Sequence, residues 1–432
     1  MSSAPTVYAI DFGTSNSLLA AANADRIFAP VPLDPDAADP TILRSIVYFP
    51  NAERAYVGEA ALAKYVENGL EGRLLRSLKR HLPARSFRGT YIGSRPMQVE
   101  DLVAVILREL RIRANAHYGV DVKRAVLGRP ARFAAEDLDD DFAERRLRSA
   151  AERAGFEEIH FLPEPVAAAR EFRAAFSGEA SGCVLVCDFG GGTSDFTVMR
   201  LGDKPFVRSD VLAIGGVPVA GDALDASIMR SHVAKNFGAD VAYRVPMGSN
   251  VLTMPPQITE QLCSPAHLSI LRRPDIAEFL RNVRSWALDG SERDKLDQLK
   301  TLVDDALGFQ LFEVIERAKR TLSTDDVAAV DFVYPSIDVH ERVTRDGFET
   351  ASGKAAATIL GCLDATVDEA GLGREGIDVV CCTGGTAKVP LLARELTARF
   401  GEDKLRDFRS FHSVVQGLAH HAMGIARCAS EV

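Results

Sequence analysis

The sequence has few cysteines, and they form no disulfide or zinc-binding pattern. Seven cysteines are scattered over 432 residues, with no Cys-x-x-Cys pair and no histidines at a matching spacing. Several stand in apolar runs, among them Cys187 and the pair Cys381-Cys382. Because free cysteine commonly behaves as a small buried hydrophobe, we expect these thiols to lie in the core of a protein that does not depend on disulfides.

The sequence also lacks a long hydrophobic run, a signal sequence and an excess of basic charge. No segment approaches eighteen consecutive apolar residues, and the first six residues lack the charged start and apolar core of a secretory signal. The formal net charge is −9, so nucleic acid would find no basic surface. We therefore expect a cytoplasmic protein with neither a membrane nor a nucleic-acid partner.

What the sequence does contain is the same glycine-rich pattern twice. DFGTS at 11–15 and DFGGGTS at 188–194 each follow an apolar, β-leaning run, at 7–10 and 184–187. Glycine lets the backbone approach an anion, the hydroxyls add hydrogen-bond donors, and a carboxylate at a strand end can position a hydrated divalent cation. The two turns therefore predict two phosphate-binding hairpins that hold one nucleotide from both sides.

The order of the predicted elements indicates a duplicated, mixed α/β architecture. The chain is longer than one hydrophobic core usually allows, so two or more domains are expected. Strands are predicted at 7–10, 16–21, 45–49, 125–127, 183–188 and 196–201, helices at 58–80, 99–118 and 136–154, and helical patterns through 281–311. Gly155 is a plausible cap for the helix that ends at 154.

Six segments resemble motifs of one protein family, in that family's order. They are DFGTSNS at 11–17, RPARF at 129–133, LPEPVAAA at 162–169, DFGGGTSD at 188–195, ERAKRTLS at 316–323 and CTGGTAKVP at 382–390. Together they resemble the actin-like ATPase superfamily and, within it, the DnaK-type heat shock protein 70 chaperones. In that family these stretches are two phosphate loops, a strand end coupled to a switch proline, the segment with that proline and a catalytic glutamate, a nucleotide-clamping helix and an adenosine motif.

The resemblance implies a fold and a division of the chain. The expected fold is α/β, the actin-like ATPase (ribonuclease H-like, duplicated) fold, with two lobes and a central nucleotide cleft. Lobe I would comprise 1–181 and lobe II 182–400, with a helical insertion at about 226–315, while 401–432 would return to lobe I. The insertion is either a partner-docking surface or a self-packed helical subdomain, and its Trp286 is expected to be a packed anchor.

The resemblance also implies the roles of the catalytic residues. Asp11 and Asp188 would hold Mg²⁺ through water, and Lys79 would contact the γ-phosphate. Asp195 would orient the attacking water, and Glu164 would order the surroundings of the metal. Taken singly, each aspartate could merely cap a turn and Lys79 could be a solvated surface charge, but the aspartates occur jointly in the family's order.

The residues implied to bind ATP or ADP fall in four groups, one for each motif. They are Gly13, Thr14, Ser15 and Asn16; Gly190, Gly191, Gly192 and Thr193; Glu316, Lys319, Arg320 and Ser323; and Gly384, Gly385, Thr386 and Lys388. An ordinary ion-paired helix would give Glu316, Lys319 and Arg320 the same spacing. At Lys388 the family usually has an arginine, whose flat guanidinium stacks on adenine in a way that an ammonium group cannot.

The chain stops at Val432, where DnaK-type chaperones continue into a peptide-binding domain. It therefore resembles the YegD-like branch, in which that domain is absent, and client-peptide binding is not expected to carry over. The favoured function is a slowly hydrolysing, Mg²⁺-dependent ATP switch that acts with an unidentified protein partner. The alternatives are a sugar- or acetate-type kinase of the same fold, an actin- or MreB-like polymerising ATPase, or nucleotide binding without hydrolysis.

Overall fold

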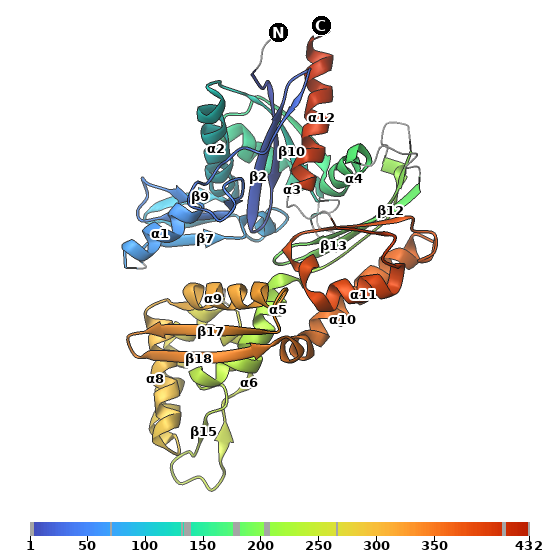
Figure 1. Cartoon of the computed structure of the whole chain (residues 1–432). Helices are drawn as coiled ribbons and strands as arrows, with labels where there is room; N and C mark the ends of the chain where they lie inside the picture. The colour runs from blue at the N-terminus through green and yellow to red at the C-terminus, as the bar shows by residue number, and fades with distance from the viewer. Residues whose placement is uncertain are drawn as a thin grey trace. The chain divides into compact units, whose positions relative to one another are not determined.

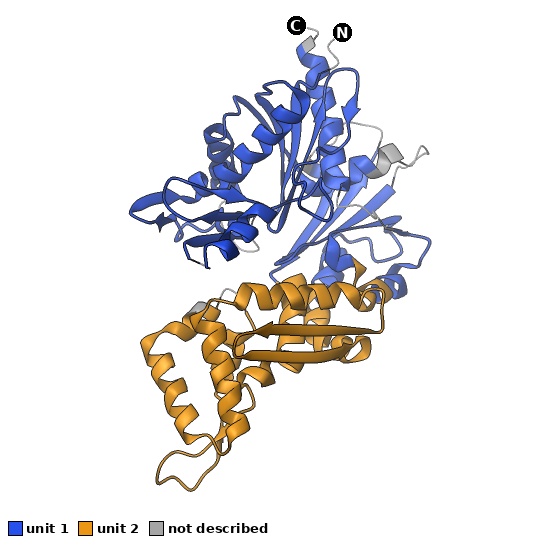
Figure 2. Cartoon of the chain, turned by 60° about the vertical axis from the view of Figure 1, so that its left-hand side comes forward, with its two compact units in different colours: residues 1–218, 360–387, 395–432 blue, residues 219–359, 388–394 orange. Residues whose placement is uncertain are grey.

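The computed structural model describes residues 4–69, 71–130, 133, 140–175, 182–202, 208–264, 267–407 and 412–430. Ala131, Arg132 and the first four residues of the helix predicted at 136–154 lie outside these ranges. The chain forms two compact units (Figure 2): unit 1 is Met1–Pro218, Leu360–Ala387 and Glu395–Val432, and unit 2 is Val219–Ile359 and Lys388–Arg394. These units divide the chain at other residues than the predicted lobes, whose boundaries stay a prediction.

The first sheet of unit 1 has the strand order β11-β10-β1-β2-β3, with β4 also paired to β2. The strands are β1 Val7–Phe12, β2 Asn16–Ala22, β3 Ile27–Phe28, β4 Leu43–Arg44, β10 Arg124–Arg129 and β11 Glu158–Pro163. β1 is antiparallel to β2 and parallel to β10, which is in turn parallel to β11. The predicted strands at 7–10, 16–21 and 125–127 are confirmed.

The second sheet of unit 1 repeats this arrangement. Its order is β14-β13-β12-β19-β20, formed by β12 Gly182–Phe189, β13 Ser194–Leu201, β14 Val211–Val217, β19 Val379–Thr383 and β20 Leu405–Asp407. Here too the central strand, β12, is antiparallel to the next strand along the chain, β13, and parallel to its other neighbour, β19. β12 therefore corresponds to β1, β13 to β2 and β19 to β10. The predicted duplication is therefore confirmed at the level of topology, strand by strand.

Four helices cover the first sheet: α2 Val99–Tyr118, α3 Asp140–Arg153, α4 Glu164–Ala175 and α12 Ser413–Ser430. Because side chains alternate across a strand, Tyr8 and Ile10 of β1 belong to the core formed with α2 and α3. Val7 and Ala9 belong to a second core, which α4 and α12 share with both sheets. Figure 1 shows α2 and α12 on opposite sides of β2.

The helix predicted at 58–80 is wrong over its second half. The helix α1 ends after Glu59–Glu67, and the chain then forms β7 at Arg73–Arg76 and the 3₁₀ helix η1 at Leu78–His81. Gly69 and Gly72 have φ of 63° and 92°, which stops a helix. The chain after them pairs with β5 rather than continuing as a helix.

The remaining strands of unit 1 are β5 Ile46–Phe49, β6 Tyr56–Val57, β8 Gly89–Ile92 and β9 Arg95–Gln98. It also contains the 3₁₀ helix η2 Arg208–Asp210 and, across the unit boundary, η6 Gly385–Lys388, α10 Arg345–Glu369 and α11 Pro390–Phe400. In the described part of the chain, no helix combines the length and apolarity needed to cross a membrane.

Unit 2 is mainly helical, with a two-stranded sheet of β17 and β18 (Figure 1). Its elements are α5 Gly221–Ile228, η3 Met229–Val233, η4 Ala234–Phe237, β15 Ala242–Tyr243, β16 Leu252–Thr253, α6 Pro256–Leu262, η5 Leu268–Arg272, α7 Pro274–Trp286, α8 Gly290–Asp304, α9 Gly308–Thr321, β17 Val327–Tyr334 and β18 Ile337–Thr344. The Trp286 ring stacks on Tyr243, with centroids 6.3 Å apart, as expected of a packed anchor.

Candidate functional site

The two glycine turns have the same construction. In the first, the Gly13 N–H donates to the Asn16 carbonyl at 3.0 Å, and in the second the Gly190 N–H donates to the Thr193 carbonyl at 2.9 Å. Each turn joins the central strand of its sheet to the next strand, with the register closing at Phe12–Ser17 and Phe189–Ser194. The equal registers place Asp11 and Asp188 at equivalent positions, two residues before their turns.

Gly13 is required by the space inside its turn. A Cβ atom on Gly13 would lie 2.2 Å from the Asn16 carbonyl oxygen, which is far inside van der Waals contact. The close approach of the Asn16 carbonyl within the turn therefore admits only glycine at position 13. Thr14 and Ser15, two hydroxyl-bearing residues, follow within the same turn.

Lys79 and Glu164 form an ion pair in unit 1. The Lys79 Nζ lies 2.6 Å from Glu164 Oε1, and only 11% and 9% of the two side chains are exposed. Lys79 lies in η1, and Glu164 is the first residue of α4. Burial lowers the pKa of Lys79, but Glu164, Asp11 and Asp188 raise it more, so the net pKa is above the ordinary value and the ammonium stays charged.

Three half-buried aspartates, Asp11, Asp188 and Asp195, interact electrostatically with this pair, and each has a raised pKa. Burial, then Glu164 and Asp188, raises the pKa of Asp11 to about 8, against the lowering effect of Lys79. Burial and Asp188 likewise raise the pKa of Asp195 to about 7. The pKa of Asp188 is raised by burial and by Glu164, again partly offset by Lys79. The site therefore holds more carboxyl groups than Lys79 alone can balance, and the raised pKa values mean that proton uptake relieves the repulsion among them.

Two threonine hydroxyls fix the aspartates of the second sheet. Thr383 Oγ1 donates to Asp188 Oδ1 at 2.9 Å from the neighbouring parallel strand, and Thr193 Oγ1 donates to Asp195 Oδ2 at 2.9 Å. Our sequence analysis missed Thr383. Thr383 directly precedes Gly384 and Gly385 at the end of an apolar strand. That position in the sequence could have indicated a polar residue of the site.

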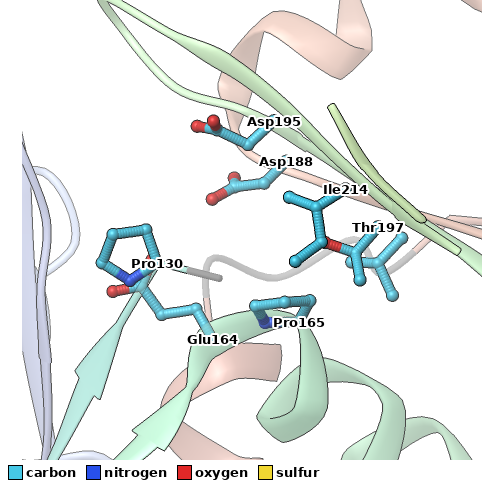
Figure 3. Close-up of a pocket in the computed structure, with 8 residues that line it drawn as sticks. Pro130, Glu164, Pro165, Asp188, Asp195, Thr197 and Ile214 are labelled. Atoms are coloured by element: carbon cyan, nitrogen blue, oxygen red, sulfur yellow. The ribbon is translucent and has the colours of Figure 1, made fainter. Parts of the chain in front are cut away.

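A small pocket lies between the carboxylates and the start of α4. It is lined by Pro130, Glu164, Pro165, Val186, Asp188, Asp195, Thr197 and Ile214. Figure 3 shows Asp188 and Asp195 pointing from the second sheet toward the side on which Pro130 and Glu164 lie. The predicted catalytic glutamate and the predicted switch proline, Pro165, therefore share a pocket with two of the predicted aspartates.

The arrangement fits a hydrated divalent cation better than a directly bound one. Over the described ranges, no three His, Cys, Asp or Glu side chains come close enough together to hold a metal ion directly. Asp11 and Asp188 nevertheless supply two half-buried carboxyl groups whose pKa values are raised by burial and by neighbouring carboxylates. Mg²⁺ usually keeps several of its waters, and such a pair of carboxylates suits it.

The segment predicted to be the adenosine motif lies beside the second turn. Gly384 has φ of 86°, and a Cβ there would lie 2.1 Å from the Phe189 carbonyl oxygen, so only glycine fits. Thr386 Oγ1 donates to the Gly190 carbonyl at 3.1 Å. Gly384, Gly385 and Thr386 thus lie in unit 1, as the two glycine turns do, whereas Lys388, the last residue of η6, belongs to unit 2.

The predicted clamping helix is α9 of unit 2, which contains Glu316, Lys319 and Arg320 and is followed by Ser323. Lys319 Nζ pairs with Asp225 at 2.9 Å and donates to the Gly221 carbonyl at 3.2 Å. Burial raises the pKa of Asp225 to about 6, although Lys319 lowers it. Lys319 therefore ties α9 to α5, a contact that the sequence did not reveal.

The structure thus brings one group of the predicted residues together within unit 1. This group is Asp11, Gly13, Thr14, Ser15, Asn16, Lys79, Glu164, Asp188, Gly190, Gly191, Gly192, Thr193, Asp195, Gly384, Gly385 and Thr386. The others, Glu316, Lys319, Arg320, Ser323 and Lys388, belong to unit 2.

Comparison with known proteins gives consistent results. The family model described as "Hsp70 protein" matches residues 85–246 and 291–429. The chain is 25% identical over 427 residues to the chaperone protein DnaK of Thermotoga neapolitana, which covers 97% of this chain and 59% of that protein. DnaK of Thermosipho africanus matches with the same identity and coverage. The chaperone protein HscA homolog of Pseudomonas aeruginosa is 37% identical over 241 residues, which is 51% of this chain and 36% of that protein.

Proposed function

The chain belongs to the Hsp70 family and has its actin-like ATPase fold, and on that premise we propose that it is an ATP-dependent molecular switch. It would bind ATP and ADP with Mg²⁺, hydrolyse ATP slowly, and act on or with a protein partner. The chain spans about 59% of the length of the DnaK relatives it matches, so their names alone do not carry this proposal. The observation that carries it is the pair of equivalent turns, with Asp11 and Asp188 at matching positions beside the Lys79–Glu164 ion pair.

Asp11 and Asp188 would hold the hydrated cation. Burial and then the neighbouring carboxylates raise the pKa of both groups, and a divalent cation would favour their charged forms. When bound, Mg²⁺ would neutralise the negative charge that develops on the phosphate oxygens. The Thr383 hydroxyl keeps Asp188 oriented, because it occupies one carboxylate oxygen and leaves the other available.

Lys79, Glu164 and Asp195 would orient the reacting groups. The Lys79 ammonium is charged, and its bond to Glu164 holds it near the carboxylates, from where it would contact the terminal phosphate. Asp195, with one oxygen bonded to Thr193, would accept a hydrogen bond from the attacking water through the other. Phosphoryl transfer depends mainly on positioning and on neutralising charge, and no strong base is present among these groups, so we infer slow turnover.

The glycine turns would contact the phosphates through backbone N–H groups. The segment 384–388 would contact the adenosine half of the nucleotide, and at its end Lys388 stands where the family usually has an arginine. Because an ammonium group does not stack on adenine as a guanidinium does, base affinity is expected to be modest. The relatives are named as chaperones, which supports a switch over a small-molecule kinase or a filament protein.

Calorimetric titration of the purified chain with ATP and with ADP, each with and without Mg²⁺, tests the proposal. We expect Mg²⁺-dependent binding of both nucleotides, weakened in Asp188→Asn. Lys300→Ala, which removes an exposed lysine of α8, is the control and should bind like the wild type. Absence of binding by the wild type would refute the proposed function.

A further inference from the structure

In both glycine turns, a hydroxyl group from another part of the chain holds the carbonyl of the first glycine. Ser45 Oγ donates to the Gly13 carbonyl at 2.8 Å, and Thr386 Oγ1 donates to the Gly190 carbonyl at 3.1 Å. The two carbonyls occupy equivalent places, because each glycine is the first residue of its turn after the paired strand. Ser45 lies outside the six motifs that the sequence contains.

The two hydroxyl groups come from different places in the topology. Ser45 is the bend between β4 and β5, whereas Thr386 lies in η6, which follows β19. β4 pairs with β2, the strand after the first turn, but β19 pairs with β12, the strand before the second turn. The duplication of the strands therefore does not account for both contacts, since the fold supplies the same hydrogen bond to each turn from a different element.

Ser45 is buried and bonded through both its backbone and its side chain. Only 1% of it is exposed, and its N–H donates to the Ser15 carbonyl at 2.8 Å. The hydroxyl of Ser17, which is fully buried, lies 2.8 Å from Ser45 Oγ. Because the one hydroxyl hydrogen of Ser45 goes to the Gly13 carbonyl, Ser17 is the donor in this second bond. The Ser45 side chain therefore cannot rotate without breaking buried hydrogen bonds.

A fixed carbonyl also fixes the direction of the next N–H group. The Gly13 carbonyl and the Thr14 N–H belong to one trans peptide, so they point in opposite directions. The contact with Ser45 therefore directs the Thr14 N–H away from Ser45. Thr386 directs the Gly191 N–H of the second turn in the same manner. Over the residues that the structure describes, neither of these N–H groups donates to a protein atom.

An N–H group that is held in direction and has no protein acceptor suits an anion. If the peptide turned over, its carbonyl oxygen would take the place of the N–H group, and the partial negative charge of that oxygen would repel a phosphate. The hydroxyl contact opposes this rotation, because the rotation would break a buried hydrogen bond.

We propose that Ser45 is a positioning residue for phosphate binding, whose hydroxyl holds the Gly13 carbonyl so that the Thr14 N–H faces the phosphates of the nucleotide. This inference rests on the proposed function. Thr386, which the resemblance assigns to nucleotide binding, acts on the second turn in the same way, because its hydroxyl is bonded to the Gly190 carbonyl.

The test measures the affinity for ADP and for inorganic triphosphate, by calorimetry in Mg²⁺, in the wild type, Ser45→Ala and Ser17→Ala. Ser45→Ala should weaken the binding of both ligands by the same factor, about threefold to tenfold, because the loss of a buried hydrogen bond releases the peptide of the turn. Ser17→Ala removes only the donor to Ser45 and should weaken both by a smaller factor.

Tyr48→Phe is the matched control. The buried Tyr48 of β5 donates its hydroxyl to the Glu71 carbonyl at 2.7 Å, so this variant also loses a hydroxyl-to-carbonyl bond, but one that does not reach the turn. Thermal melting should show a loss of stability in both Tyr48→Phe and Ser45→Ala, while only Ser45→Ala loses affinity.

Wild-type affinity in Ser45→Ala, an equal loss of affinity in Tyr48→Phe, or a loss for ADP without a loss for triphosphate would overturn the role of Ser45 while the proposed function stands. No nucleotide binding by the wild type would overturn both.

Discussion

The Nζ atom of Lys79 lies 2.6 Å from Oε1 of Glu164, although 85 residues separate them in the chain. This contact joins η1, on one side of the first sheet, to the start of α4 on the other. The Lys79 ammonium is also the positive charge that lowers the pKa values of Asp11, Asp188 and Asp195. Because the aspartates are more numerous than the charge that balances them, the ligand-free site is expected to destabilise the fold in a pH-dependent way.

The first prediction concerns Asp11. Its pKa is about 8 in the folded protein and near 3.9 when unfolded, so the folded state binds more protons between these values. The free energy of unfolding contributed by this group therefore falls as pH rises from about 4 to about 8. Asp11→Asn should stabilise the ligand-free protein at pH 8, by at least about 1 kcal/mol, and much less at pH 5.

Thermal melting at both pH values measures this effect. Mg²⁺ should stabilise the wild type at pH 8 more than it stabilises Asp11→Asn. Asp275→Asn, at an exposed ion pair, serves as the control and should show no such dependence on pH. If Asp11→Asn and the wild type are equally stable at pH 8, burial and the neighbouring carboxylates do not destabilise the charged form of Asp11.

The second prediction concerns Thr383. Thr383→Val removes the hydrogen bond to Asp188, which lowers the pKa of that carboxyl and orients it. A hydrogen bond to a charged group contributes about 1.5–3 kcal/mol, so the Mg²⁺ concentration that half-saturates ATP hydrolysis should rise at least about tenfold. Thr383→Ser keeps the hydroxyl and should remain close to the wild type. If valine and serine behave alike, the hydroxyl has no part in cation binding.

The third prediction uses two glycines in different surroundings. Gly13→Ala places a methyl group 2.2 Å from the Asn16 carbonyl, so the first turn must open and nucleotide affinity should fall at least about tenfold. Gly361→Ala, on α10 with no atom within 4 Å of the new Cβ, should instead stabilise the helix by about 0.5–1 kcal/mol. Calorimetry and thermal melting measure the two effects, and wild-type affinity in Gly13→Ala would show that the closed turn is not needed.

The fourth prediction concerns adenine recognition. Lys388→Arg should raise the affinity for ADP, by about threefold to tenfold, because a guanidinium stacks on the base while an ammonium does not. The affinity for inorganic triphosphate, which has no base, should not change. A gain of equal size for both ligands would indicate an effect of charge on the phosphates rather than stacking.

The fold was predictable where local chemistry and topology agree. The two turns were visible in the sequence because each joins an apolar strand to glycine and hydroxyl residues, and the helix at 99–118 has the bounds of α2. The helix predicted at 58–80 failed because strand pairing with β5, a tertiary contact, determines the structure of 73–76.

Individual contacts of the site were less accessible to the sequence. The threonine that fixes Asp188 comes from a strand 195 residues away, and the partner of Lys319, Asp225, lies on another helix. The hydroxyl that holds the Gly13 carbonyl comes from Ser45, which lies 32 residues further along the chain. Such contacts follow from the fold, and no spacing within the chain indicates them.

The most direct test of the proposed function is the single-turnover rate of ATP hydrolysis by the full chain, with and without Mg²⁺, compared with Lys79→Ala. The wild type should hydrolyse ATP slowly and only with Mg²⁺, and Lys79→Ala should be at least about a hundredfold slower, because the buried cation toward the phosphate is lost. The control, Lys300→Ala, should match the wild type. Hydrolysis that is independent of Mg²⁺, or equal in Lys79→Ala and the wild type, would contradict a switch that operates at this site.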